Sequence, residues 1–179
     1  MDIDMIRRTM DDMPFYPMPD GYRMRHWQKD DLQLWIDLNS PDFDEGEIND
    51  ELFHQEYGYD DTLHAQRIYF LMHNYQVIGT ISAWFGDDAY GEAYGKHVGR
   101  IHWVVIVPEY QGKGLSKPMM SYACHKLIEF GHKSAFLHTE TELIPALGLY
   151  LKFGFQPDIE SDDLQIAWDE ALKLVRYTR

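Results

Sequence analysis

The residues best placed to do chemistry lie in a loop of sequence QGKGLS at positions 111–116. The β-branched run before it, 104–107, predicts a buried strand, and Pro108 ends that strand because proline cannot donate to a sheet. An apolar pattern with helical spacing begins directly after the loop. A strand, a glycine turn and a helix start together present backbone N–H groups and the positive end of a helix dipole, which bind phosphate. The sequence therefore predicts a site for a phosphorylated cofactor.

The spacing of the loop excludes two common phosphate-binding motifs. It lacks the G-x-x-x-x-G-K-[ST] pattern of a P-loop, and Lys117 stands where a dinucleotide fingerprint needs its third glycine. The loop instead resembles the Q/R-x-x-G-x-G/A loop of the GCN5-related N-acetyltransferase (GNAT) family, which binds the pyrophosphate of acetyl-CoA. Gln111, Gly114 and Ser116 occupy the three motif positions, and Ser116 departs from the usual Gly or Ala.

A second segment resembles the closing signature of the same family, a helix with Ala-x-x-Leu-Tyr that stops at Gly-Phe. Ala146, Leu149 and Tyr150 share one helical face, and Gly154 is a natural left-handed end for that helix. The two signatures occur in the family's order, and the resemblance covers residues 67–157 closely.

The resemblance implies an α/β fold, with a mixed, mostly antiparallel, splayed sheet of about six or seven strands flanked by four or five helices. We expect a single domain, 1–179, with an N-terminal arm at 1–20, a cofactor-binding core at 67–157 and a C-terminal helix at 161–176. That helix replaces the strand pair with which the family usually closes. The hydrophobic periodicity predicts these elements: strands at 22–27, 68–72, 77–84, 99–107 and 135–139, and helices at 30–38, 49–55, 115–130, around Tyr150 and at 161–176.

The resemblance also implies roles for particular residues. Free N–H groups near Val104 and Ile106 would pair with the pantetheine arm and the acetyl oxygen, and Tyr150 would protonate the departing thiolate. A phenol, with a reference pKa near 10, is a reasonable donor to an alkyl thiolate. The residues assigned to the cofactor are Val104, Val105, Ile106, Val107, Gln111, Gly112, Lys113, Gly114, Leu115, Ser116, Lys117 and Lys152.

The general base is left open by the sequence. Several relatives carry a carboxylate on the central strand near the position of Arg100, and arginine cannot act as a base. His102 lies two residues further on, hence on the same face of the strand, and its reference pKa near 6.5 suits the task. There are two alternatives to His102 as the base. His102 could simply cover one side of a half-exposed strand, or a chain of ordered water could accept the proton without a dedicated base. Further candidates follow the next strand: His138, Glu140 and Glu142.

Composition limits the partners and the compartment. The formal net charge of −14, from 30 acidic and 16 basic residues, disfavours nucleic acid and could steer cationic amines toward the protein. The single Cys124 excludes a disulfide within the chain and fits a reducing compartment. No apolar run is long enough for a membrane span, so we expect a cytoplasmic protein. The nine histidines show no metal-binding spacing, and no metal is expected.

These observations predict an acetyl-CoA-dependent N-acetyltransferase that transfers acetyl directly to an amine, more readily of a small molecule than of a protein. The segments 21–66 and 86–99 would form the acceptor pocket. Two alternatives stay open: a non-catalytic acyl-CoA-binding sensor or interaction module on the same fold, and a transferase for another acyl group or for an oxygen acceptor. A homodimer also stays open.

Overall fold

The computed structural model describes residues 1–40, 47–86 and 97–177. Contacts divide the chain into two compact units, and strand β5 contributes to both. The first unit comprises Met1–Pro14, Phe85–Arg100 and Leu127–Arg179, and the second comprises Phe15–Trp84 and Ile101–Lys126. The expected loop at 86–99 lies for the most part outside the described residues.

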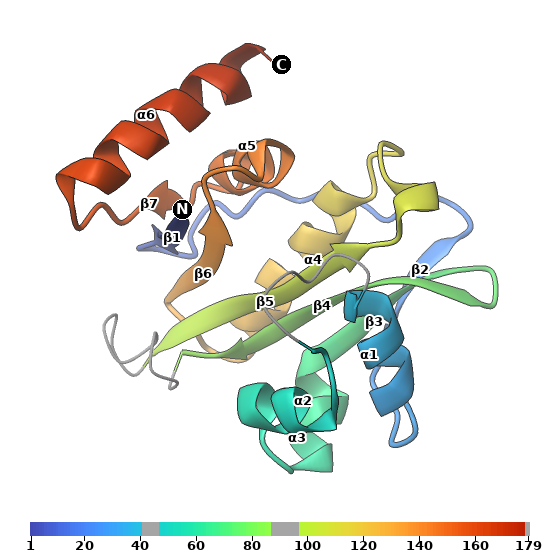
Figure 1. The fold of residues 1–179 in the computed structure, drawn as a ribbon. Helices are drawn as coiled ribbons and strands as arrows, with labels where there is room; N and C mark the ends of the chain where they lie inside the picture. The colour runs from blue at the N-terminus through green and yellow to red at the C-terminus, as the bar shows by residue number, and fades with distance from the viewer. Residues whose placement is uncertain (41–46, 87–96, 178–179) are drawn as a thin grey trace. The chain divides into compact units, whose positions relative to one another are not determined.

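The described strands form one sheet in the order β2-β3-β4-β5-β6-β1-β7 (Figure 1). Their bounds are β1 Asp2–Arg7, β2 Tyr22–His26, β3 Ile68–His73, β4 Gln76–Phe85, β5 Val98–Ile106, β6 Ser134–Glu140 and β7 Gln156–Pro157. The pairs β1–β6, β1–β7, β2–β3 and β3–β4 are antiparallel, whereas β5–β6 is parallel. This confirms the predicted mixed, mostly antiparallel sheet.

The helices of the described residues follow most of the predicted positions. Their bounds are α1 Leu32–Asn39, α2 Asp50–Tyr57, α3 Asp61–Arg67, α4 Ser116–Glu129, α5 Ile144–Lys152 and α6 Asp162–Tyr177. Asn49 caps α2, since its side chain accepts a hydrogen bond from the N–H of Leu52 at 2.9 Å. Helix α3 was not predicted. None of the described helices is long and apolar enough to cross a membrane.

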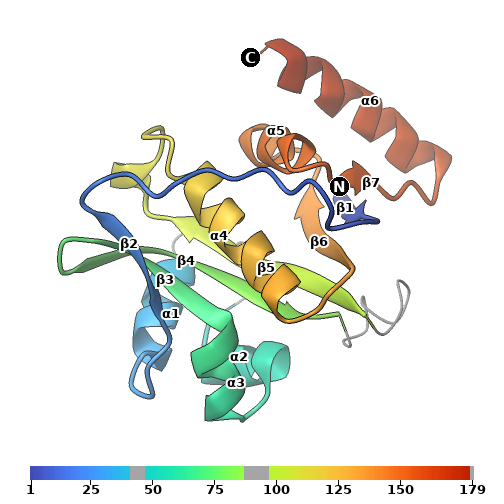
Figure 2. The same cartoon turned by 180° about the vertical axis from the view of Figure 1, so that it is seen from behind.

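In the second unit, helices cover both faces of strands β3 and β4. Figures 1 and 2 show α1 and α2 on one face and α4 on the other. On the first face Trp35 of α1 packs edge-on against Trp103 of β5, with ring centroids 4.9 Å apart. On the opposite face Tyr69 of β3 meets Tyr122 of α4 at 5.0 Å. The single cysteine, Cys124, is fully buried in α4.

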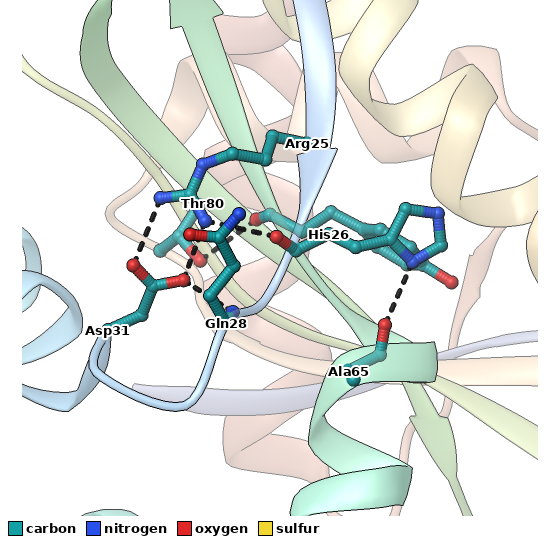
Figure 3. A network of polar contacts seen from close by, with 7 residues as sticks. Arg25, His26, Gln28, Asp31, Ala65 and Thr80 are labelled. Atoms are coloured by element: carbon teal, nitrogen blue, oxygen red, sulfur yellow. Dashed lines mark hydrogen bonds and ion pairs between the residues drawn. The ribbon is translucent and has the colours of Figure 1, made fainter.

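An ion pair anchors the start of α1 to strand β2. Figure 3 shows the guanidinium of Arg25 directed at the carboxylate of Asp31, with Nη1–Oδ2 and Nη2–Oδ1 distances of 2.6 and 3.1 Å. The same carboxylate accepts the main-chain N–H of Gln28 at 2.6 Å. The neighbouring His26 on β2 contacts the carbonyl of Ala65 in α3. A bidentate, largely buried ion pair fixes the orientation of its two side chains more firmly than an exposed pair does. Strand β2 therefore positions α1 through Arg25 and α3 through His26.

Strand β4 contains an irregularity that brings it close to β5. Its register with β3 shifts between Leu71 and Met72, so that Leu71 faces Gly79 and Met72 faces Val77. The carbonyl of Ile78 then accepts the N–H of Val107 at 2.9 Å. A Cβ on Gly79 would stand only 2.4 Å from the carbonyl oxygen of Val105. The absence of a side chain at Gly79 therefore permits the approach of β5.

The first unit contains a strand that the sequence analysis placed in an extended arm. Strand β1, within 1–20, pairs along its length with β6 and briefly with β7. The predicted first strand, at 22–27, is consequently the second, β2. The guanidinium of Arg7 at the end of β1 donates to the carbonyls of Thr9, Phe153 and Asp11, which connects this strand to the end of α5.

Helix α6 confirms the predicted C-terminal helix at 161–176. It begins after Ser161, whose hydroxyl accepts the N–H of Leu164 at 3.2 Å, and it lies beside α5 (Figures 1 and 2). The apolar face of α6 is buried and consists of Leu164, Trp168, Ala171 and Val175.

His138 on β6 pairs with Asp4 on β1 in the first unit. Its Nδ1 lies 2.7 Å from the Asp4 Oδ1, and the two side chains are 32% and 22% exposed. The hydrogen bond to Asp4 is the main reason why the pKa of His138 lies above its usual 6.5, against a smaller effect of burial. Imidazolium is therefore stabilised by the fold.

We expect Gly79→Ala to destabilise the protein, because the new Cβ would collide with the main chain of Val105. The cost should be about 1–3 kcal/mol, measured by urea unfolding. Gly148→Ala is the control, since its Cβ would meet only Val175 at 3.6 Å and alanine favours a helix by about 1 kcal/mol. Equal or greater stability of Gly79→Ala than of wild type would contradict the expectation.

Stability should also depend on pH through His138. Because its folded pKa is raised, the pair stabilises the fold fully below about pH 6.5 and loses that contribution as pH rises through the folded pKa. The difference in unfolding free energy between wild type and Asp4→Asn should therefore shrink from pH 6 to pH 8.5, by less than about 1 kcal/mol since both groups are partly exposed. When both proteins also carry His138→Gln, the effect of Asp4→Asn on the unfolding free energy should no longer change with pH. If that effect is already constant with pH in the presence of His138, the His138–Asp4 pair does not cause the pH dependence.

Candidate functional site

The glycine loop lies between the end of β5 and the start of α4, as predicted. A 3-10 turn, Pro108–Tyr110, leads into it. Gly112 and Gly114 have φ values of 73° and 78°, a region that side chains rarely adopt. A Cβ at either position would meet nothing within 4 Å. The backbone is thus left-handed at two points and open to a ligand.

Contacts within the second unit hold this loop in place. The amide of Gln111 donates through Nε2 to the carbonyl of Ile106 at 2.9 Å, which closes the loop back onto β5. The ammonium of Lys113 lies 4.3 Å from the ring centroid of Tyr110. The hydroxyl of Tyr110 in turn lies 2.9 Å from Nδ1 of His73 on β3. Tyr110 and His73 were missed by the sequence analysis, because their pairing joins residues that are distant along the chain.

The beginning of α4 carries the remaining loop residues. Leu115 is buried and its carbonyl accepts the N–H of Met119, whereas Ser116 is the first helical residue. The ammonium of Lys117 lies 5.8 Å from the ring of Tyr16. The helix has 14 residues, so its N-terminus carries a developed dipole that favours anions.

The last part of β5 supplies the backbone beside the loop. Val104, Val105 and Ile106 are half-buried, and within the second unit β5 is the terminal strand of the series β2-β3-β4-β5. The N–H of Val107 is already engaged with Ile78. Trp103, just before them, has a φ of 49°. A left-handed bulky residue within a strand marks a local distortion of the kind found at functional sites.

His102 pairs with a carboxylate that the sequence analysis did not identify. Its Nε2 lies 2.5 Å from Oε2 of Glu56, on α2. The two side chains are only 11% and 27% exposed. Glu56 is distant in sequence and sits on an otherwise ordinary acidic helix, so no local pattern distinguishes it. The second unit thus combines the loop, the β5 backbone and a histidine–carboxylate pair.

The other predicted residues belong to the first unit. Tyr150 of α5 is 7% exposed, and burial raises the pKa of its phenol to about 12. The hydroxyl is therefore protonated at neutral pH. Lys152 is the last, exposed residue of the same helix.

The three further base candidates on and after β6 differ in their surroundings. His138 is paired with Asp4. Glu142 receives hydrogen bonds from the N-terminal amino group, which hold the pKa of its carboxyl below the usual value. Glu140 is exposed at the end of β6. Among the described residues, no group of three or more His, Cys, Asp or Glu side chains could hold a metal ion.

Comparisons with known proteins agree with this geometry. The Acetyltransferase (GNAT) family matches residues 21–155. The mycothiol acetyltransferase of Thermobifida fusca is 33% identical over 70 residues, which are 39% of this chain and 22% of that protein. The chain thus spans under a quarter of that relative's length.

Similar solved structures share the fold at low sequence identity. A GCN5-related N-acetyltransferase from Sphaerobacter thermophilus has a TM-score of 0.68 at 16% identity, over 88% of this chain and 48% of that one. A fungal glucosamine N-acetyltransferase region has a TM-score of 0.63 at 14% identity, over 88% of this chain and 20% of that one. At such identities the likeness concerns the fold alone. Because the family match covers most of the chain, the chain belongs to the GCN5-related N-acetyltransferase family.

Proposed function

We propose that this enzyme transfers the acetyl group of acetyl-CoA directly to an amine of a small molecule. The observation that carries the proposal is the loop at 111–116. Its two left-handed glycines and the start of α4 leave backbone N–H groups and open space where an anion binds. This arrangement fits the pyrophosphate of acetyl-CoA, with Lys113 and Lys117 adding positive charge nearby.

The adjoining part of β5 suits the extended arm of the same molecule. The described pairing of β5 with β6 covers only Val98–Arg100, and a strand segment beyond such pairing offers N–H and C=O groups to an extended ligand. We assign the N–H groups of Val104 and Ile106 to this role, as the family resemblance implies. An N–H directed at the oxygen that gains charge during acyl transfer stabilises that charge by a few kcal/mol, on the order of 3.

Tyr150 is the proposed donor of a proton to the departing thiolate. This role rests on the family resemblance and is supported by the burial that keeps the phenol protonated. Lys152 would meet the phosphates of the cofactor.

An amine acceptor is supported by the acidity of the chain, since a net charge of −14 attracts cations. One similar solved structure is a fungal glucosamine N-acetyltransferase region, so glucosamine is the first acceptor to test. The single cysteine fits action in the cytoplasm.

Gly114→Ala should weaken acetyl-CoA binding about 5- to 30-fold, because a side chain at φ near 78° disfavours the left-handed turn by about 1–2 kcal/mol. Isothermal titration calorimetry with acetyl-CoA measures this. Gly58→Ala is the matched control: its φ is 69°, a Cβ there also meets nothing within 4 Å, and it lies in another loop. No binding by wild type, or equal loss in both variants, would refute the cofactor site.

Tyr150→Phe should retain acetyl-CoA affinity but lower kcat about 100-fold, the usual size of a general-acid contribution. The measurement is thiol release with glucosamine, with Tyr75→Phe as control because Tyr75 is 97% exposed. Unchanged kcat would remove Tyr150 from the mechanism. Binding with no thiol release for any acceptor would favour the sensor alternative.

A further inference from the structure

The pair formed by His102 and Glu56 is more enclosed than an ordinary surface contact. The imidazole Nε2 and the carboxylate Oε2 are 2.5 Å apart, and neither side chain is more than 27% exposed. A carboxylate at this distance accepts the Nε2–H, so it selects the tautomer that has its lone pair on Nδ1. Glu56 thus determines both the orientation and the protonation pattern of His102.

Aromatic and hydroxyl groups surround the pair. The ring of Tyr57 lies 5.5 Å from that of His102, and its hydroxyl is 2.8 Å from the hydroxyl of Ser82. Trp103 contributes a ring 5.7 Å away. Two further titratable side chains lie beside this cluster in the described part of the second unit: Tyr57 from α2, and His64 from α3, whose Nε2 lies 3.2 Å from the carbonyl of Tyr57.

The position of His102 on β5 links it to the proposed cofactor site. Val104, the first backbone position assigned to the cofactor, is two residues further along the same strand. Two residues of chain span at most about 7 Å, so the two positions lie within that distance although Trp103 distorts the strand between them. A small amine can bridge that distance between the imidazole and an acetyl group.

The charge of the surrounding helices favours a cation. Helix α2 carries three acids, Asp50, Glu51 and Glu56, and α3 follows with Asp60 before it and Asp61 at its start. Arg67, at the end of α3, is buried and donates to the main-chain carbonyl of Ala83. An ammonium ion approaching α2 is therefore attracted, and an anionic acceptor is repelled.

We propose that His102 is the base that removes a proton from a cationic primary amine, and that Glu56 is its positioning residue. This inference rests on the proposed function. The Nδ1 atom of His102 accepts one proton from R–NH3⁺, either directly or through a group hydrogen-bonded to both. The carboxylate of Glu56 then stabilises the positive charge of the imidazolium. The neutral amine nitrogen then forms the C–N bond as the C–S bond of the thioester breaks. A second proton leaves the nitrogen and one is delivered to the thiolate, so the net products are the acetamide, the free thiol and one proton, which His102 returns to water.

The test compares Glu56→Gln and His102→Gln with wild type. Thiol release is measured between pH 6 and 9 with saturating acetyl-CoA and each of three amines. These are glucosamine, 1,4-diaminobutane and a C-terminally amidated tripeptide with an N-terminal alanine. The amine that wild type acetylates fastest is then used for every variant, so the ionisation of the amine contributes equally to all the pH profiles. Glu51→Gln is the matched control, because it removes the same charge from an exposed position of the same helix.

His102→Gln should lower kcat/KM about 100-fold and remove the part of the acid limb that comes from the imidazole, so that the remaining limb follows the ionisation of the amine alone. Glu56→Gln should lower the plateau about tenfold and move the acid limb to lower pH by about one unit, because imidazolium loses its counter-charge. Both variants should bind acetyl-CoA like wild type. Glu51→Gln removes only part of the general attraction for a cation, so its acid limb should stay where wild type has it and its kcat/KM should fall far less than that of Glu56→Gln.

Two outcomes would overturn the inference while leaving the proposed function intact: an unmoved acid limb in Glu56→Gln, and a loss as large in Glu51→Gln as in Glu56→Gln. Two other outcomes would instead remove the proposed function itself: failure of wild type to bind acetyl-CoA, and binding without thiol release for any of the three amines.

Discussion

The close contact between β4 and β5 is the constraint on which the functional part of the second unit depends. Gly79 lets the carbonyl of Val105 approach, and the carbonyl of Ile78 engages the N–H of Val107. These two contacts fix where β5 ends and hence where the glycine loop starts. The loop then returns to the same strand through Gln111 and Ile106. A small change in the β4 register would displace the backbone and the loop together, because they share one strand end.

Charged side chains that are largely buried in the second unit are held by specific partners. Burying an isolated charge is expensive, and a partner with good geometry avoids most of that expense. Arg25 meets Asp31 in a bidentate pair, and Glu56 meets His102. The first of these pairs fixes the start of α1 beside β2, and the second connects α2 to β5. This face of the second unit is thus organised by polar contacts as well as by its tryptophans.

The sequence predicted the elements whose signals are local. The glycine loop, the Tyr150 helix, the capped helix after Asn49 and the C-terminal helix each carry their own turn, cap or periodicity signals, and the structure has a corresponding element for each. Strand β1 had the alternation of a strand, with Ile3 and Met5 buried. The prolines that follow it suggested an arm instead, and only its pairing with β6 establishes the strand.

Other features were invisible because they depend on contacts between distant residues. Strand β7 has 2 residues and exists through its pairing with β1. Glu56 differs from Glu51 in sequence by nothing that indicates chemistry, and the difference arises from the face of α2 that meets β5. The left-handed Trp103 is likewise imposed by its surroundings, since tryptophan has no local preference for that conformation.

The burial of Cys124 has a practical consequence for assays of this protein. It is the single thiol of the chain and it is shielded inside α4. Disulfide reagents that detect a free thiol in solution will therefore encounter little background from the folded protein. Conversely, the rate at which a thiol reagent modifies Cys124 under native conditions reports how often α4 separates from the sheet. Cys124 can therefore be used to measure local opening of this region.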